Sequence, residues 1–283
     1  MDAGINKILC ALDFCAASRN ALRFAMQLAD AYQAELSLLH VMEPIPDAVI
    51  DVPQSMSAIN RKLLDDTRDR LRNMADEVLD EIGEELVNTP VLTSEVAIGP
   101  IGMTVNDEAD EQQIDLILIG TNGAAAKPWW MTSVAADVID HPHVPVLVVP
   151  VEAAYRPLHR ISFATDLRQA DVLHLLKLSE YLQPMTPEIR CLHIVADERE
   201  RKEVDLDEMI HVFKDKLTGI PITFHQSEED DVTEALEAFN LMYHVDMQVL
   251  VRPRRNFFSE LFHVSQSKKT AGYTHIPLLV WPG

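Results

Sequence analysis

The sequence predicts an α/β protein made of two copies of one domain, each a parallel β-sheet covered by helices. A repeat covers the start of each half, because residues 5–44 align without a gap with residues 158–197. Short apolar runs alternate with amphipathic stretches throughout the chain, and this alternation is typical of parallel sheets with helical connections. The repeat is longer than the period of a solenoid array, so it indicates a duplicated domain. We therefore expect domains at residues 1–152 and 153–283.

Matching positions in the two halves carry the same polar residues. The alignment places Asp13 on Asp166 and His40 on His193. The halves also end alike, in VPVLVVP and in IPLLVWP. The chain has 283 residues, about twice the common domain size, so each half is long enough to bury a core of its own.

The expected elements follow the same order in both halves. In the first half the strands are 7–12, 35–41, 91–98, 115–119 and 146–149, and the helices are 18–32, 58–85, 102–111 and 133–139. In the second half the strands are 160–164, 188–194, 221–225, 247–251 and 278–280, and the helices are 171–182, 203–216, 231–243 and 265–273. We expect Ser18 to cap the first helix and residues 43–57 to form a loop. The joint at residues 152–157 is short, which favours a fused pseudo-dimer.

The charge balance argues against two classes of partner. The net charge is −21, and the first half carries most of it, with 9 Lys and Arg against 25 Asp and Glu. Such a surface repels nucleic acid and anionic membranes. An anionic ligand would need backbone N–H groups and a few local cations.

The cysteines and the apolar runs indicate a cytoplasmic protein. The cysteines Cys10, Cys15 and Cys191 are too few for a disulfide framework, and Cys10 and Cys191 lie in apolar runs typical of core positions. No signal peptide opens the chain, and no apolar run is long enough to span a membrane.

Two segments of the first half follow strands at the expected ligand-binding edge. Ligands of open α/β sheets bind beyond the carboxyl ends of strands, where the strand order reverses. Asp13 follows the first strand, and a loop beginning at Gly120 and Gly123 follows the fourth and leads through Lys127 to Thr132. Glycines let backbone N–H groups approach a phosphate, and a helix N-terminus adds unpaired donors. A tight turn is the alternative interpretation of the two glycines.

Both halves carry an ordered set of motifs along their expected strands. The first half carries ILCALDF, LSLLHVME and IDLILIGTNGA, and the second half carries ISFATDL, RCLHIVAD and IPLLVWP. This set resembles the universal stress proteins in tandem form, and the resemblance covers nearly the whole chain. It implies a Rossmann-like fold, of the adenine nucleotide alpha hydrolase-like type, with a five-stranded parallel sheet of order 3-2-1-4-5 in each domain.

The resemblance also implies a nucleotide site in the first domain. ATP-binding members hold adenine with the acid that ends strand one and with the end of strand two, positions that match Asp13 and Val41. Their loop runs Gly, two residues, Gly, nine residues, Gly, then Ser or Thr. Gly120 and Gly123 match the first pair of glycines, and Ser133 matches the final hydroxyl. The implied ligand is ATP or AMP, with Mg²⁺.

The chain departs from that loop pattern in both halves. Eight residues instead of nine follow Gly123, so Thr132 stands where the family has glycine. In the second half, arginines and Pro253 replace the glycine loop, and Pro253 removes a backbone donor. An anion site in that half would use Asp166, Arg252, Arg254, Ser265 and Ser267. The arginines have an alternative role in ion pairs with the acidic first half.

Structural roles stay open for several of these residues. Asp13 and Asp166 have the alternative role of closing a turn or capping a helix. His40 and His193 occupy matching positions, although a nucleotide site is expected only in the first half. A role shared by both halves is therefore structural, which favours core packing or a hydrogen bond. The spacing of His, Cys and acidic residues shows no zinc site, and no nucleophile motif is present.

Two functions are consistent with the sequence. The first is a stress-response factor with one nucleotide pocket in the first domain and a degenerate second domain. The second is an interaction or scaffold protein whose pockets are vestigial, which the shortened loop and Thr132 favour. We expect no catalytic residues, and weak ATP hydrolysis stays an open alternative. The resemblance further implies an intramolecular pseudo-dimer, and a homodimer of the whole chain stays open.

Overall fold

The computed structural model describes residues 4–42, 53–121, 138–139, 142–165, 169–195, 221–229, 231–251 and 276–282. The chain separates into two compact units. The N-terminal unit comprises Ile5–Asn122 and Trp130–Glu152, and the C-terminal unit contains Ala153–Gly283.

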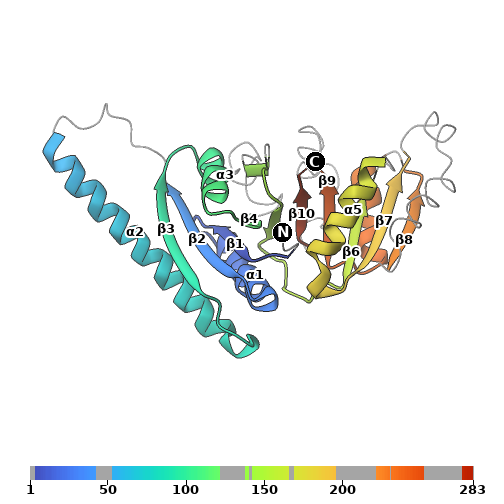
Figure 1. Ribbon diagram of the computed structural model, residues 1–283, viewed down its shortest axis with the longest axis horizontal. Coiled ribbons are helices and arrows are strands. Elements are labelled where there is room, and N and C mark those ends of the chain that lie inside the picture. The colour runs from blue at the N-terminus through green and yellow to red at the C-terminus, as the bar shows by residue number, and fades with distance from the viewer. Residues whose placement is uncertain are drawn as a thin grey trace. The chain divides into compact units, whose positions relative to one another are not determined.

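The N-terminal unit is an α/β domain with one parallel sheet (Figure 1). Its described strands are β1 (Lys7–Ala11), β2 (Glu35–Met42), β3 (Leu92–Ile98), β4 (Leu116–Thr121) and β5 (Val146–Pro150). Its described helices are α1 (Ala16–Tyr32), α2 (Pro53–Ile82) and α3 (Ile101–Glu111), with a 3₁₀ turn at Gly83–Glu85. Parallel pairs join β3 to β2, β2 to β1, β1 to β4 and β4 to β5, which gives the order 3-2-1-4-5.

The sheet is buried because its central strands are apolar on both faces. Ile8, Leu9 and Cys10 of β1 are fully buried, and burial of each large side chain contributes roughly 1.5–3 kcal/mol. Helix α1 packs on β1, β4 and β5 and also contacts α2, whereas α3 contacts β2. The chain adds β2 and β3 on one side of β1, and it then crosses back to add β4 and β5 on the other side. Because the crossovers are right-handed, α3 lies on the face of the sheet opposite α1 and α2.

The C-terminal unit has the same topology. Its described strands are β6 (Arg160–Ala164), β7 (Glu188–Ile194), β8 (Ile222–Ser227), β9 (Met247–Val251) and β10 (Leu278–Trp281). Its described helices are α5 (Gln169–Tyr181) and α7 (Val232–Met242), with a 3₁₀ turn at Gln183–Met185. The parallel pairs give the order β8-β7-β6-β9-β10, which is again 3-2-1-4-5.

The two units share unusual backbone conformations at matching positions where their amino acids differ. Gln33 and Thr186 occupy matching positions before the second strand of each unit and have φ of 55° and 45°. Gln113 and His244 precede the fourth strand of each unit and have φ of 56° and 50°. These four residues lie in the left-handed region that non-glycine residues seldom adopt, so their recurrence is strong evidence for duplication.

An aspartate ties the fourth strand to the first in both units. Asp115 Oδ2 accepts the backbone N–H of Lys7 at 3.0 Å, and Asp246 Oδ2 accepts that of Arg160 at 2.9 Å. The Arg160 guanidinium also donates to Asp246 at 2.8 Å. The same side chain thus holds the starts of the two central strands together in each copy.

The structure corrects two expectations about the elements and leaves others outside the described residues. Helix α1 begins at Ala16 with Cys15 as its N-cap, so Ser18 is inside the helix. Helix α2 begins at Pro53, so the expected loop at residues 43–57 is too long; proline suits a first helical turn because the missing N–H has no helical partner there. The helices expected at 203–216 and 265–273 lie outside the described residues, as does most of 133–139.

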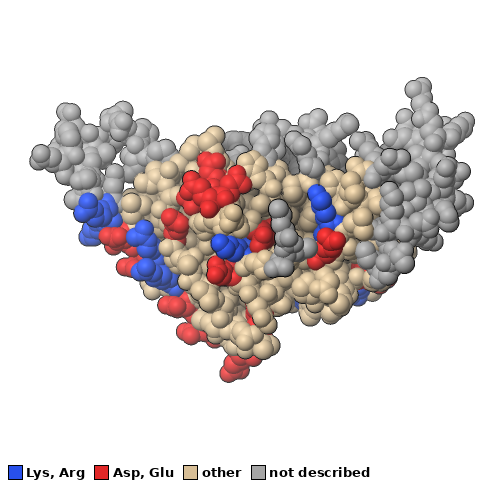
Figure 2. Space-filling view, viewed as in Figure 1, with Lys and Arg blue, Asp and Glu red and all other residues tan. Residues whose placement is uncertain are grey.

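The acidic charge is unevenly distributed over the surface of the N-terminal unit. Figure 2 shows Lys and Arg interleaved with Asp and Glu along α2, whereas the side chains gathered over α3 are acidic. Among the described helices, none is long and apolar enough to cross a bilayer.

Candidate functional site

Three of the predicted site residues come together at the carboxyl edge of the N-terminal sheet. Ala11 at the end of β1 pairs with Leu39 of β2 and with Ile119 of β4. Asp13 follows β1 by two residues, Val41 is near the end of β2, and Gly120 is near the end of β4. The strand order therefore brings these residues to one edge, as the ligand site of an open α/β sheet requires.

The other predicted site residues lie outside the described part of the chain. In the N-terminal unit these are Gly123, Thr132 and Ser133, and in the C-terminal unit they are Asp166, Arg252, Arg254, Ser265 and Ser267.

The Asp13 carboxylate closes a turn and is ionised at neutral pH. Its Oδ1 accepts the backbone N–H of Cys15 at 3.0 Å, so the turn-closing role expected as an alternative is present. Partial burial alone would raise the pKa of Asp13, but hydrogen bonds from Cys15 and Ser18 outweigh it and lower the pKa below its ordinary value. A carboxylate offers about four acceptor positions, and the hydrogen bonds from Cys15 and Ser18 occupy part of them.

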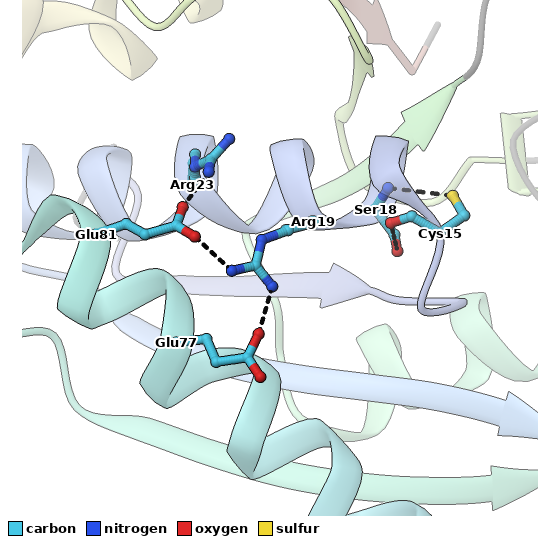
Figure 3. Close-up of polar contacts among 6 residues, drawn as sticks. All are labelled: Cys15, Ser18, Arg19, Arg23, Glu77 and Glu81. Carbon is cyan, nitrogen blue, oxygen red and sulfur yellow. Dashed lines mark hydrogen bonds and ion pairs between the residues drawn. The ribbon is translucent and has the colours of Figure 1, made fainter.

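Cys15 replaces the expected hydroxyl cap of α1. Its Sγ accepts the backbone N–H of Ser18 at 3.4 Å, and the Ser18 hydroxyl donates to the Cys15 carbonyl at 3.0 Å (Figure 3). Burial, and next its hydrogen bond to Asp13, raise the pKa of the Cys15 thiol, so it stays protonated at neutral pH. Burial also raises the pKa of Cys10 and Cys191, which are fully buried as predicted. None of these thiols has the low pKa of a nucleophile.

Gly120 has a packing role at this edge. A Cβ atom placed on Gly120 would lie 2.4 Å from both the carbonyl carbon and the oxygen of Ala17, and 2.6 Å from the backbone nitrogen of Ser18. These are backbone atoms in the first turn of α1 and cannot rotate away. The close approach of helix and strand therefore requires a glycine here whether or not a ligand binds.

Phe14 lies beside Asp13 in a rare backbone conformation. Its φ is 63°, in the left-handed region, which costs a bulky residue about 1–3 kcal/mol. Its ring lies 4.7 Å from the ring of His40, and the guanidinium carbon of Arg70 lies 4.1 Å from the centre of the Phe14 ring. These contacts hold the Phe14 ring against β2 and α2.

The two matching histidines have a structural role in both units. His40 Nδ1 lies 2.6 Å from the carbonyl oxygen of Leu12, and His193 Nδ1 lies 3.0 Å from that of Thr165. Each ring therefore hydrogen-bonds to the backbone just beyond the end of the first strand. The expectation of a hydrogen-bonded histidine is confirmed in both copies.

Ion pairs hold α2 alongside α1 (Figure 3). Arg19 donates to Glu77 at 2.7 Å and to Glu81 at 2.5 Å, and Arg23 pairs with Glu81 as well. Single exposed pairs contribute little, but a network shared between two helices orients one helix against the other. Part of the charge on α2 thus docks this helix on α1.

Arg70 and Phe14 are the pair that the sequence reading missed. One weak signal was available in α2. Arg68 and Arg72 each have an aspartate three residues earlier and pair with it, whereas the residue three before Arg70 is Thr67. The contact between Arg70 and Phe14 joins residues 56 positions apart, so local spacing could not predict it.

In the C-terminal unit, His225 of β8 and Arg190 of β7 form a cluster with Tyr243, the residue after α7. His225 Nδ1 lies 3.3 Å from the Tyr243 hydroxyl, and its Nε2 lies 3.0 Å from the Thr223 hydroxyl. The Arg190 guanidinium carbon lies 4.5 Å from the centre of the Tyr243 ring, and Arg190 pairs with Glu188 at 3.0 Å. Burial, and next the charge of Arg190, lower the pKa of His225 despite the opposing charge of Glu188.

This cluster predicts acid sensitivity in the C-terminal unit. A histidine whose pKa is lowered by folding leaves stability unaffected above the ordinary pKa of 6.5, and stability falls as the pH decreases from there toward the folded-state pKa. His174 contributes with the same sign, since burial lowers its pKa too. At pH 5.5 we expect residues 221–229 to take up deuterium faster in wild type than in His225→Gln, with little difference at pH 7.5. Equal uptake by both proteins at pH 5.5 would contradict this.

The fold and the positions of these residues define a protein of two Rossmann-like units, with a carboxylate at the ligand edge of the first. Residues 4–150 match the model of the Universal stress protein family. The chain belongs to this family.

A curated relative covers about half of the chain, and solved structures of similar fold cover nearly all of it. The universal stress protein YxiE of Bacillus subtilis is 28% identical over 148 residues, which are 51% of this chain and 98% of YxiE. A universal stress protein structure from Archaeoglobus fulgidus has a TM-score of 0.64 at 16% identity and covers 98% of this chain and 96% of its own. A structure of a functionally unknown protein from Pseudomonas aeruginosa has a TM-score of 0.58 at 15% identity, with 98% and 92% covered. At these identities the two structures support the fold of both units.

Proposed function

We propose that the protein is a stress-response factor whose N-terminal unit binds an adenine nucleotide of the ATP or AMP type. The observation that carries this proposal is the fixed, ionised Asp13 carboxylate at the edge where β1 meets β2 and β4. An ionised carboxylate accepts hydrogen bonds and does not donate them, so it suits the amino group of adenine or the hydroxyls of ribose. Val41 would supply backbone contacts to the base.

The phosphates would lie toward the segment that follows β4. Gly120 begins that segment, and the sequence adds Gly123, Thr132 and Ser133 as backbone and hydroxyl donors. Mg²⁺ would accompany the phosphates, since magnesium is commonly held by substrate phosphates and few protein ligands. Within the described ranges, no group of three or more His, Cys, Asp or Glu side chains could hold a metal ion by itself.

The proposed role is binding, without fast turnover. The lowered pKa of Asp13 keeps it unprotonated near neutral pH, which makes it a weak general base and a poor general acid. Its neighbours in sequence are Leu12 and Phe14, so no second acid adjoins it in the chain.

A second candidate function is an interaction protein without a nucleotide. The observation that favours it is the packing of α1 on Gly120, because this packing explains the glycine without any ligand. The replacement of the family's loop glycine by Thr132 points the same way.

Titration calorimetry separates the two functions. For the first, ATP or AMP should bind wild type saturably, and Gly123→Val should abolish the heat because a branched side chain blocks approach to the loop backbone. Gly83→Val is the matched control, since no heavy atom lies within 4 Å of a Cβ at Gly83. Absence of heat at about 1 mM ATP, a concentration that reveals binding free energies near −4 kcal/mol, would leave the interaction protein as the function.

A further inference from the structure

An arginine of α2 lies against the residue that follows the Asp13 carboxylate. The guanidinium carbon of Arg70 is 4.1 Å from the centre of the Phe14 ring, and Phe14 is bonded directly to Asp13 in the chain. The Phe14 ring also contacts His40, whose Nδ1 lies 2.6 Å from the Leu12 carbonyl oxygen. A continuous set of contacts therefore runs from the end of β1 to a cation on α2.

Arg70 differs from its neighbours on the same helix. Arg68 pairs with Asp65 at 3.3 Å, and Arg72 pairs with Asp69 at 3.4 Å. Arg70 makes no ion pair of 4.0 Å or less with any residue in the described segments, although its side chain is exposed. The positive charge of Arg70 thus lies against an aromatic ring, and no carboxylate of the described residues forms an ion pair with it.

The charge of the unit makes such a cation significant. The first 152 residues carry a net charge of −16, and one of their negative charges, that of Asp13, lies at the edge itself. A phosphate-bearing ligand would be repelled unless a local positive charge compensated. Guanidinium is suited to this, because its N–H donors lie in its plane and match phosphate oxygens, while its flat face stacks on an aromatic ring.

We propose that Arg70 is the residue that selects for the negative charge of a ligand bound at Asp13, so that α2 takes part in the site. The proposal rests on the nucleotide-binding function above and adds a guanidinium group to the donors that the loop after β4 would supply. The position of Phe14 fits this role, because its ring lies 4.7 Å from the His40 ring and 4.1 Å from the guanidinium carbon of Arg70. The pairs from Arg19 to Glu77 and Glu81 keep α2, and with it Arg70, beside α1.

The test compares a charged and an uncharged ligand on matched variants. ATP and adenosine are titrated calorimetrically into wild type, Arg70→Gln and Arg72→Gln, the last being an exposed arginine two residues away on the same helix. We expect Arg70→Gln to lower the affinity for ATP about tenfold and the affinity for adenosine less than twofold. We expect Arg72→Gln to change both affinities less than twofold. The dependence of ATP affinity on salt should also become shallower in Arg70→Gln, because one positive charge that attracts the ligand is lost. If Arg70 had a purely structural role, Arg70→Gln would lower the affinities for ATP and for adenosine by the same factor.

The outcomes separate this inference from the function on which it rests. Equal weakening of ATP and adenosine in Arg70→Gln, or an unchanged ATP affinity, would overturn the role of Arg70 while leaving the nucleotide site intact. Absence of binding of both ligands to wild type would overturn the nucleotide site and the inference together. Arg70→Lys gives a further check, since it keeps the charge and loses the planar fork; we expect an ATP affinity between those of wild type and Arg70→Gln.

Discussion

Gly120→Ala is expected to destabilise the N-terminal unit by about 3 kcal/mol, the upper part of the range for overpacking a tight contact. The added methyl group would lie 2.4 Å from the backbone of Ala17, so either α1 or β4 has to move. Helix α1 cannot shift freely, because the buried Asn20 side chain donates to the Pro150 carbonyl of β5 at 2.8 Å. Chemical denaturation of the variant, with circular dichroism as the signal, measures this loss.

The same substitution should weaken nucleotide binding as well. The first turn of α1 carries Ser18 and adjoins Cys15, the residues whose hydrogen bonds hold Asp13. Gly83→Ala is the matched control, because no atom lies within 4 Å of its new methyl group; we expect a change of less than about 0.5 kcal/mol, as at ordinary surface sites. If Gly120→Ala proved as stable as Gly83→Ala, the packing account of this glycine would be wrong.

Asn240→Ala is expected to cost the C-terminal unit about 3 kcal/mol, because it would leave two buried polar groups without partners. The Ser162 hydroxyl donates to Asn240 Oδ1 at 2.8 Å, and Asn240 Nδ2 donates to Gln248 Oε1 at 2.7 Å. Ser162 and Gln248 are fully buried and directly paired on β6 and β9. Thermal or urea denaturation of the variant tests this value.

The N-terminal unit provides a rescue variant for this network. The positions that match Ser162, Asn240 and Gln248 hold Leu9, Ala109 and Ile117, all of them buried. We expect the triple variant Ser162→Leu, Asn240→Ala, Gln248→Ile to recover most of the lost stability, since replacing all partners by apolar groups leaves no unsatisfied donor. If the triple variant were less stable than Asn240→Ala, the apolar residues of the N-terminal unit could not replace the three polar residues at the matching positions of the C-terminal unit.

The fold was predictable from the sequence because its signals are local. Runs such as Ile8–Leu9–Cys10 are buried on both faces, and the alternation of strands and helices leaves few topologies. The resemblance to universal stress proteins supplied the strand order, which the strand pairs show in both units. His40 and His193 were assigned correctly because one position recurred in two halves that differ in their expected chemistry.

The remaining features depend on contacts that sequence spacing does not encode. Ser18 is the stronger capping residue by preference, yet it lies inside α1 while Cys15 accepts the hydrogen bond. The left-handed conformations of Gln33 and Thr186 carry no glycine or asparagine signal. Phe14 and Arg70 meet only because α2 docks on α1, through ion pairs between residues more than fifty positions apart.

The central claim is that one nucleotide binds per chain, at the Asp13 edge of the N-terminal unit. Calorimetric titration with ATP tests this claim on wild type and on two variants at matched positions, Asp13→Asn and Asp166→Asn. Asparagine at position 13 keeps the oxygen that closes the turn and removes the negative charge. We predict one equivalent bound by wild type and by Asp166→Asn, and at least a tenfold weaker affinity in Asp13→Asn. Two equivalents per chain, or an Asp13→Asn protein that binds as wild type does, would contradict the account.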